Sequence, residues 1–338
     1  MQQARLAPGD GVLVCALDGQ REAVLEDVQF SYPLKLIVPK RRFRPRLQCV
    51  YALSYGGGLV AGDRVRLKVE VREGSTLVML TQGSTKVFKQ RPGRYLSDPS
   101  FLTPTSSTEQ LYRLSVAPSS FLILLPAPVT CFSRARYTQK QVVHLADETS
   151  SVVLLDWYTS GRMGMEHETR GKNEEWEFER YRSENEVWIG GRRIARDVLL
   201  LEDEQVAADS SPSDPPSPAA DAPTPSSDSP TPAARQTTYR ARVSPYSCYA
   251  TLFLFGPHTS ALVSALSSAF ARITQYKQAL PYSLVWSFSP LPGHPGGGGV
   301  ARCAGASTEE VREWVQHVLG EGGIEEMISR DLWRTAFS

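Results

Sequence analysis

Two short runs carry the residue types best suited to local chemistry. They are Ser54 to Asp63, which reads SYGGGLVAGD, and Thr81 to Phe88, which reads TQGSTKVF. Gly56, Gly58 and Ala61 satisfy the G-x-G-x-x-[GA] pattern of dinucleotide sites, but that pattern must open a helix. The residues after this run alternate between polar and apolar types, which predicts a strand instead.

A P-loop is the second phosphate-binding motif to consider. Gly57 and Gly62 are spaced like its glycines, yet Asp63 stands at the lysine position and Arg64 at the hydroxyl position. A carboxylate at that place would repel phosphate. We therefore interpret the run as a tight bend, since consecutive glycines permit positive φ and close backbone approach.

Standard catalytic motifs are missing from the sequence. There is no G-x-S-x-G motif, and His167-Glu168 is not followed by a second histidine at metalloprotease spacing. The five cysteines are dispersed and form no C-x-x-C pair, so we expect buried, reduced thiols. A Cys–His pair formed in space stays open, but the missing motifs favour a protein that is not an enzyme.

One acidic segment could bind a metal ion. It contains Glu166, His167 and Glu168, with Glu174 and Glu175 nearby. Borderline cations such as nickel accept imidazole nitrogen and carboxylate oxygen. A solvated acidic strand end explains the same residues, and the residues alone favour that interpretation.

The composition limits the classes of partner. The chain has 338 residues and a net charge of +1, which gives no general electrostatic case for nucleic acid or a membrane surface. No apolar run approaches a membrane span and no signal peptide is visible, so we expect a cytoplasmic protein. The basic cluster Lys40 to Arg46 suits an anionic partner or a solvated loop, and we favour the loop.

Strand patterns dominate the chain. The Val65–Val71 and Leu77–Leu80 strands are joined by a turn at Glu73 to Ser75, and we expect a hairpin that ends at the TQGSTK run. Gly190-Gly191 predicts a second hairpin. Further strands are expected at 48–53, 110–116, 121–125, 141–145, 151–158, 196–201, 247–255, 284–288 and 300–303.

Helical periodicity occurs only late in the sequence. Apolar residues recur every three or four positions from Leu262 to Ile273, and a second helix begins at the Ser307/Glu310 capping box and ends at Gly320. We expect the apolar segment Ile324 to Phe337 to dock on the body. The prediction is a mostly β fold with two helices in the C-terminal half.

Composition also divides the chain. Residues 205–238 are rich in Pro, Ser, Ala and Asp and should be disordered, because they cannot bury enough apolar surface. We expect residues 1–204 and 239–338 to form the two parts of one β-rich body, and residues 90–107 to form a loop.

The two opening runs, followed by LLDWYTSGRMGM, EEWEFERYRS, ATLFLFG and VREWVQHVL in this order, resemble the urease accessory protein D family (UreD, also UreH). The resemblance covers nearly the whole folded chain, and the insertion suggests a eukaryotic or fungal member. It implies a helicoidal stack of many β-strands with two helices. It also implies a maturation factor that binds apo-urease and UreF, which recruits the GTPase UreG.

In this family the assembly delivers nickel to urease, and UreD is thought to contain a polar passage for the ion. The resemblance therefore implies transient Ni²⁺ and no tightly bound cofactor. Weak oxygen ligands suit transit, because thiolates hold such a metal too strongly. Carried over by motif position, the candidate ligands are Asp63 and Asp156, with Glu175 less certain because it lacks a neighbouring glycine; the supporting residues are Gln82, Thr85, Lys86 and Arg162.

From the residues alone, Asp156 and Arg162 flank a turn after an apolar strand and could form a surface ion pair. Beside the resemblance stand two alternatives, a purely structural β-rich adaptor without a metal passage and a hydrolase on a β scaffold. The two helices and the apolar C-terminal segment are the partner surface we expect, since amphipathic helices often bind partners.

Overall fold

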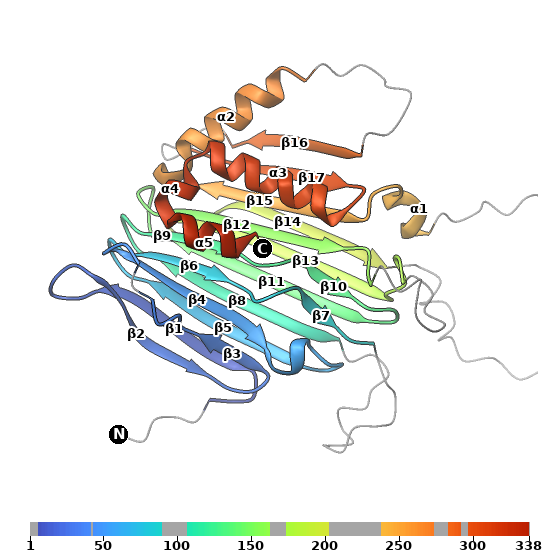
Figure 1. The fold of residues 1–338 in the computed structure, drawn as a ribbon, viewed down its shortest axis with the longest axis horizontal. Helices are drawn as coiled ribbons and strands as arrows, with labels where there is room; N and C mark the ends of the chain where they lie inside the picture. The colour runs from blue at the N-terminus through green and yellow to red at the C-terminus, as the bar shows by residue number, and fades with distance from the viewer. Residues whose placement is uncertain are drawn as a thin grey trace, which may run out of the picture.

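The computed structural model describes residues 6–41, 43–89, 107–162, 174–202, 238–273, 283–291 and 297–337. The described strands form two stacked sheets, and the longer helices lie beside the C-terminal strands (Figure 1). The mostly β fold is therefore confirmed. Nearly all of the predicted loop at 90–107 and of the predicted insertion at 205–238 lies outside the described residues.

One sheet has seven strands, and its central strands run parallel to one another. Its edges are closed by the antiparallel pairs β13–β14 and β1–β2. In spatial order the strands are β14 (Arg192–Glu202), β13 (Arg180–Ile189), β11 (Arg136–Leu145), β8 (Thr108–Val116), β5 (Arg64–Val71), β1 (Asp10–Leu17) and β2 (Ala23–Phe30).

The other sheet has ten strands. Its spatial order is β16 (Leu284–Pro290), β17 (Gly298–Gly305), β15 (Cys248–Phe255), β12 (Ser151–Thr159), β9 (Phe121–Leu125), β6 (Thr76–Leu80), β4 (Leu47–Ser54) and β3 (Leu34–Ile37), while β7 (Thr85–Val87) and β10 (Val129–Cys131) pair beside β12.

Strand β12 shows how the layers divide the core. All nine of its residues are buried, and its side chains alternate between two apolar clusters. Val152 and Leu154 point toward the seven-stranded sheet, whereas Val153 and Leu155 point toward the helices. The ten-stranded sheet is therefore the middle layer of three.

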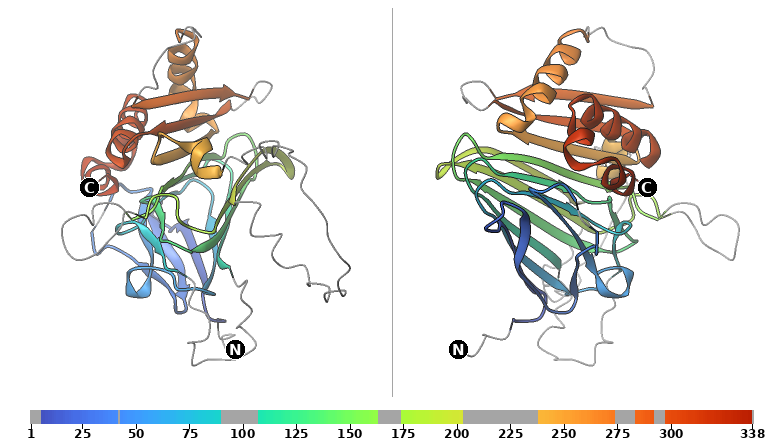
Figure 2. Two further views of the ribbon diagram at one scale, coloured as in Figure 1. Left: turned by 90° about the vertical axis from the view of Figure 1, so that its right-hand side faces the viewer. Right: turned by 60° about the vertical axis from the view of Figure 1, so that its left-hand side comes forward.

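The helices are α1 (Tyr239–Val243), α2 (Ser260–Ala271), α3 (Thr308–Glu321), α4 (Ile324–Ile328) and α5 (Arg330–Ala336), with short 3₁₀ turns η1 (Tyr55–Gly57) and η5 (Pro257–Thr259). In Figure 2 the red C-terminal helices lie on one side of the molecule and strands β13 and β14 on the other. No helix in the described part of the chain has the length and hydropathy needed to cross a bilayer.

For helix α3 the predicted start is confirmed, whereas the predicted end at Gly320 is slightly too early. Ser307 and Glu310 form the capping box of α3. The helix continues through Gly320, and Gly322 is its C-cap, because a helical glycine carries only a modest propensity penalty. The segment after it forms α4 and α5, whose apolar side chains pack on the ten-stranded sheet as expected.

The hairpin predicted for β5 and β6 is wrong. Strand β5 pairs in parallel with β1 and β8, whereas β6 pairs in parallel with β4 and β9 in the other sheet. The turn between them carries the chain from one layer to the other. The two strand patterns are local and cannot distinguish a hairpin from such a crossing. The Gly190-Gly191 hairpin is confirmed, with φ of +53° and +81° between β13 and β14.

Candidate functional site

The two runs singled out in the sequence lie against each other. The Leu59 amide donates to the Lys86 carbonyl at 2.8 Å, and the Phe88 amide donates to the Leu59 carbonyl at 2.9 Å. A Cβ atom on Gly58 would lie 2.7 Å from the Lys86 carbonyl oxygen, so only glycine fits there. The glycine run is thus a tight bend seated on β7, as interpreted.

Asp63 stabilises the end of this bend. Its Oδ2 accepts a 2.9 Å hydrogen bond from the Val60 amide, and its carbonyl accepts one from the Glu109 amide at the start of β8. Partial burial raises the pKa of Asp63, while the Val60 hydrogen bond opposes that rise. The position therefore has a local structural role, and the predicted metal role stays a prediction.

Asp156 lies inside β12 rather than at a turn, which corrects the interpretation from sequence. Its carboxylate faces the seven-stranded sheet and accepts three hydrogen bonds from neutral side chains. Gln139 Nε2 donates to Oδ1 at 2.9 Å, and Ser183 Oγ and Asn185 Nδ2 donate to Oδ2 at 2.6 Å each. Burial raises the pKa of Asp156, and these hydrogen bonds only partly offset it.

Further polar side chains extend this network across the sheet. Tyr137 Oη and Gln110 Nε2 approach Gln139 Oε1 at 3.2 and 3.4 Å, and Gln141 Nε2 donates to Asn185 Oδ1 at 3.0 Å. We call Gln110, Gln139, Gln141, Ser183, Asn185 and Asp156 the polar layer.

Strand register assembles the polar layer. Gln110 on β8 is level with Gln139 on β11, which is level with Ser183 on β13; Gln141 is level with Asn185. Because alternate residues of a strand share a face, all five side chains point toward β12. An aromatic row that includes Tyr137 and Tyr181 lies on one side of them, and Val143 and Val187 lie on the other.

A small cavity adjoins the polar layer. Its volume of about 20 Å³ suffices for one water molecule. Its polar lining comes from Thr81, Thr85, Gln110, Gln139, Gln141 and Asp156. The structure therefore brings Asp156 and Thr85, two of the predicted residues, to one cavity.

The other predicted residues lie outside that lining. Gln82 and Lys86 are exposed on the TQGSTK segment. Arg162 forms its ion pair with Glu174 at 2.8 Å instead of with Asp156, and Glu174 also accepts a hydrogen bond from the Ser133 amide. Glu175 is more than one-third exposed and lies 4.0 Å from Arg240.

No group of three or more His, Cys, Asp or Glu side chains within the described ranges is arranged to bind a metal ion. Residues 166–168 of the predicted acidic segment lie outside those ranges. All five cysteines are free and buried. Burial raises the pKa of Cys15 to about 11 and of Cys49, Cys248 and Cys303 to about 12, so these thiols stay protonated.

Sequence reasoning missed Gln139, Gln141, Ser183 and Asn185. The sequence of β11 contained a sign of them. Gln139 and Gln141 occupy the same alternate positions as Tyr137 and Val143, and the apolar character of those two residues marks that side of the strand as buried. Polar residues in a buried phase must hydrogen-bond one another or a buried group.

Fold and site together define a class: a two-sheet β protein with a buried polar layer around one carboxylate. The model of the UreD urease accessory protein family matches residues 8–330, and the chain belongs to this family. The resemblance drawn from the sequence motifs is confirmed, and membership gives the protein a role in urease maturation.

Relatives from three groups of organisms match the chain. Urease accessory protein 4 of Cryptococcus neoformans is 37% identical over 310 residues, which cover 90% of this chain and 87% of the relative. Urease accessory protein UreD of Sorangium cellulosum is 32% identical, with 92% and 79% covered. Urease accessory protein D of Arabidopsis thaliana is 35% identical over a shorter match, with 52% and 54% covered.

Proposed function

We propose that this protein is a non-catalytic scaffold that joins apo-urease to UreF, and through UreF to the GTPase UreG. In this proposal Ni²⁺ reaches urease through the space between the two sheets, beside Asp156. Membership of the UreD family supports a role in urease maturation. The observation that supports a nickel route is the buried Asp156 carboxylate, which has three neutral hydrogen-bond donors and no ion pair within the described residues.

An unpaired buried carboxylate attracts a cation. Burial disfavours its ionised form and so raises the pKa of Asp156, and a bound divalent ion would reverse that preference. The carboxylate and the Gln139 amide oxygen are oxygen ligands, which bind nickel less strongly than thiolates do. Such ligands suit an ion that must be released.

The size of the cavity sets a condition on transit. About 20 Å³ holds one water-sized particle, so a hydrated ion cannot fit without shedding water or separating the sheets locally. Oxygen atoms of the polar layer could replace part of the lost hydration shell. Asp63 and Glu175 remain predicted further ligands, although each already makes a contact of its own.

Co-purification with UreF, UreG and apo-urease tests the proposal. We expect one complex in which nickel moves to urease after GTP is added, as measured by the metal content of re-isolated urease. Loss of either partner from the complex, or full nickel loading of urease in a strain that lacks this gene, would contradict it.

A purely structural adaptor is the second candidate. The observation that favours it is that the Asp156 carboxylate already accepts three hydrogen bonds from the seven-stranded sheet. These bonds join the two sheets, and that structural role explains the buried carboxylate without a metal ion. Asp63→Ala and Asp156→Ala variants separate the two. If both variants bind UreF and apo-urease and urease still activates normally, the adaptor is correct.

A further inference from the structure

Two segments far apart in the sequence form one exposed surface. Lys40, Arg41 and residues 43–46 precede β4 and are called the basic loop, and α5 lies near the C-terminus. Arg41 forms an ion pair with Asp331 on α5. Phe43 packs against the apolar cluster that also contains the buried side chains of α5. The basic loop and α5 therefore lie against the same part of the ten-stranded sheet.

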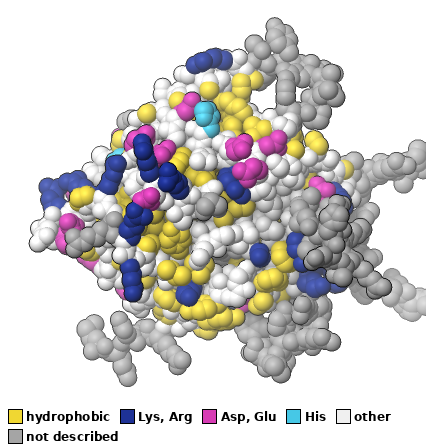
Figure 3. Space-filling view, viewed as in Figure 1, with side chains coloured by type: hydrophobic (Ala, Val, Ile, Leu, Met, Phe, Trp, Pro, Cys, Tyr) yellow, Lys and Arg dark blue, Asp and Glu magenta, His cyan; other side chains and the backbone are white. Residues whose placement is uncertain are grey.

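This surface gathers positive charge. We call Lys40, Arg41, Arg44, Arg46, Arg330 and Arg334 the basic patch; all six residues are exposed. Arg330 and Arg334 are four residues apart and share one side of α5. Figure 3 shows several Lys and Arg side chains on this face around the site of α5, with some Asp and Glu side chains among them.

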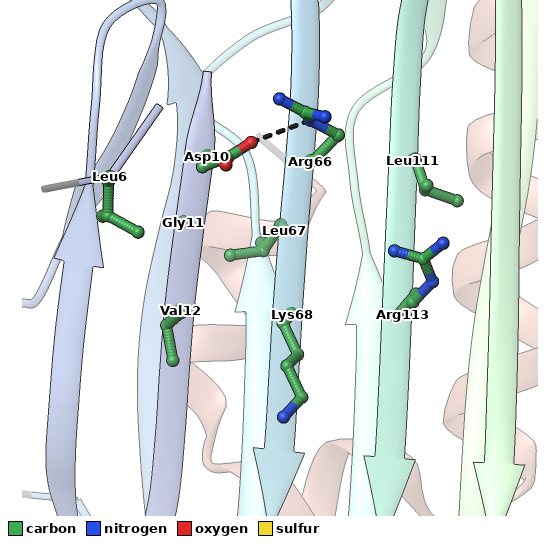
Figure 4. A pocket seen from close by; sticks show the side chains of 9 residues that line it. All are labelled: Leu6, Asp10, Gly11, Val12, Arg66, Leu67, Lys68, Leu111 and Arg113. Atoms are coloured by element: carbon green, nitrogen blue, oxygen red, sulfur yellow. Dashed lines mark ion pairs between the residues drawn. The ribbon is translucent and has the colours of Figure 1, made fainter. Parts of the chain in front are cut away.

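Most cations of the basic patch have no ion-pair partner among the residues that the structure describes. Within the described ranges only Arg41 forms an ion pair. The outer face of the seven-stranded sheet differs: Arg66 pairs with Asp10 at 2.8 Å, and Lys68 pairs with Glu70 at 2.7 Å. Figure 4 shows the first of these pairs in an open pocket of about 270 Å³.

The charge balance argues for a complementary acidic partner. The full chain carries a net charge of only +1, so the basic patch is a local excess. Unpaired cations at an exposed surface steer association with a negative surface and disfavour other partners.

Nucleic acid fits this surface poorly. A sequence pI of about 7.6 is far below that of typical nucleic-acid-binding domains, and Glu325 and Glu326 on α4 lie close to the basic patch in the chain. A long phosphate backbone would meet these carboxylates as well. A compact acidic region on a folded protein avoids that repulsion.

We infer that the basic patch docks an acidic surface of a protein partner in urease maturation. The inference rests on the proposed function, because it identifies one contact that the scaffold makes. Docking here would place the partner on the helical layer, on the opposite side of the ten-stranded sheet from the polar layer.

A charge-reversal variant tests this. Lys40→Glu, Arg44→Glu and Arg334→Glu are combined, and Lys68→Glu, Arg113→Glu and Arg192→Glu on the seven-stranded sheet form the control, with the same change in charge. Dissociation constants for UreF and for apo-urease are measured at 50 and 300 mM NaCl. Circular dichroism checks folding, and the matching Gln variants replace any reversal variant that does not fold.

We expect the patch variant to bind one of the two partners at least tenfold more weakly at 50 mM NaCl and to lose most of the salt dependence of wild type. The control should stay within twofold. Equal binding of wild type and patch variant to both partners overturns the docking inference but leaves the proposed function standing. If wild type binds neither partner, both the docking inference and the proposed function are wrong. Competition by duplex DNA or by anionic vesicles at partner concentrations would show a phosphate ligand instead and also overturn it.

Discussion

Strands β11 and β13 carry two opposite electrostatic environments on their two faces. On the inner face, Gln139, Ser183 and Asn185 surround Asp156 with neutral donors. On the outer face, Glu184 lies between Lys140 Nζ at 3.2 Å and Arg182 at 2.6 Å. Both carboxylates are buried, so their partners make the difference.

The titration of the two carboxylates follows these partners. Burial raises the pKa of Glu184, but hydrogen bonds from Lys140 and Arg196 outweigh it and lower the pKa to about 2. The pKa of Asp156 is raised because burial dominates over its neutral donors. Glu184 is thus neutralised by cations of the chain itself, whereas Asp156 has only neutral hydrogen-bond donors within the described residues, as the proposed cation route requires.

Replacing Glu184 should have the largest effect on stability. Glu184→Ala removes the acceptor of Arg182 and one of two acceptors of Lys140 and Arg196, which keep Glu186 at 3.0 and 3.9 Å. Losing one partner of a buried pair costs several kcal/mol, and because these cations are partly exposed we expect about 2 kcal/mol. Urea denaturation measures the change, and urease activation per folded molecule should stay unchanged.

Replacing Asp156 should destabilise the fold less. Asp156→Ala leaves three buried donors without an acceptor, which costs roughly 1–3 kcal/mol, but it also removes an unfavourable buried charge. We expect a net loss of about 1 kcal/mol by urea denaturation. A loss larger than that of Glu184→Ala would mean that Asp156 is chiefly a structural residue.

The contribution of Glu184 to the free energy of unfolding should decrease as the pH falls, which distinguishes it from Asp156. The folded pKa lies below the unfolded value, so the stabilisation is present above pH 4.5 and is lost as the pH falls toward 2. The advantage of wild type over Glu184→Gln in unfolding free energy should therefore shrink between pH 5 and pH 3. An advantage that grows in this range would contradict the assigned ion pairs.

Asp156 should show the smallest effect, with the opposite sign. Its folded pKa lies above the ordinary value of 3.8, so protonation favours the folded state and stability is lost as the pH rises through the folded pKa. Wild type should gain stability relative to Asp156→Asn as the pH is lowered from 7 to 4. A constant difference across that range would show that the carboxylate is not electrostatically strained.

Local patterns predicted most elements but not their partners. Alternation identified β5, and the run Phe121 to Leu125 gave β9 with its observed ends, because each pattern depends only on nearby residues. The assignment of β5 and β6 to different sheets depends on long-range pairing and was missed. For the same reason Arg162 pairs with Glu174 instead of the predicted Asp156.

Nickel transfer by paired variants tests the central claim most directly. Wild type, Asp156→Asn and Glu184→Gln are each assembled with UreF, UreG and apo-urease at limiting nickel, and nickel in re-isolated urease is counted after GTP addition. We expect transfer to fall at least tenfold with Asp156→Asn and to stay within twofold of wild type with Glu184→Gln. Equal transfer by wild type and Asp156→Asn, with the complex intact, would contradict a route past the Asp156 carboxylate.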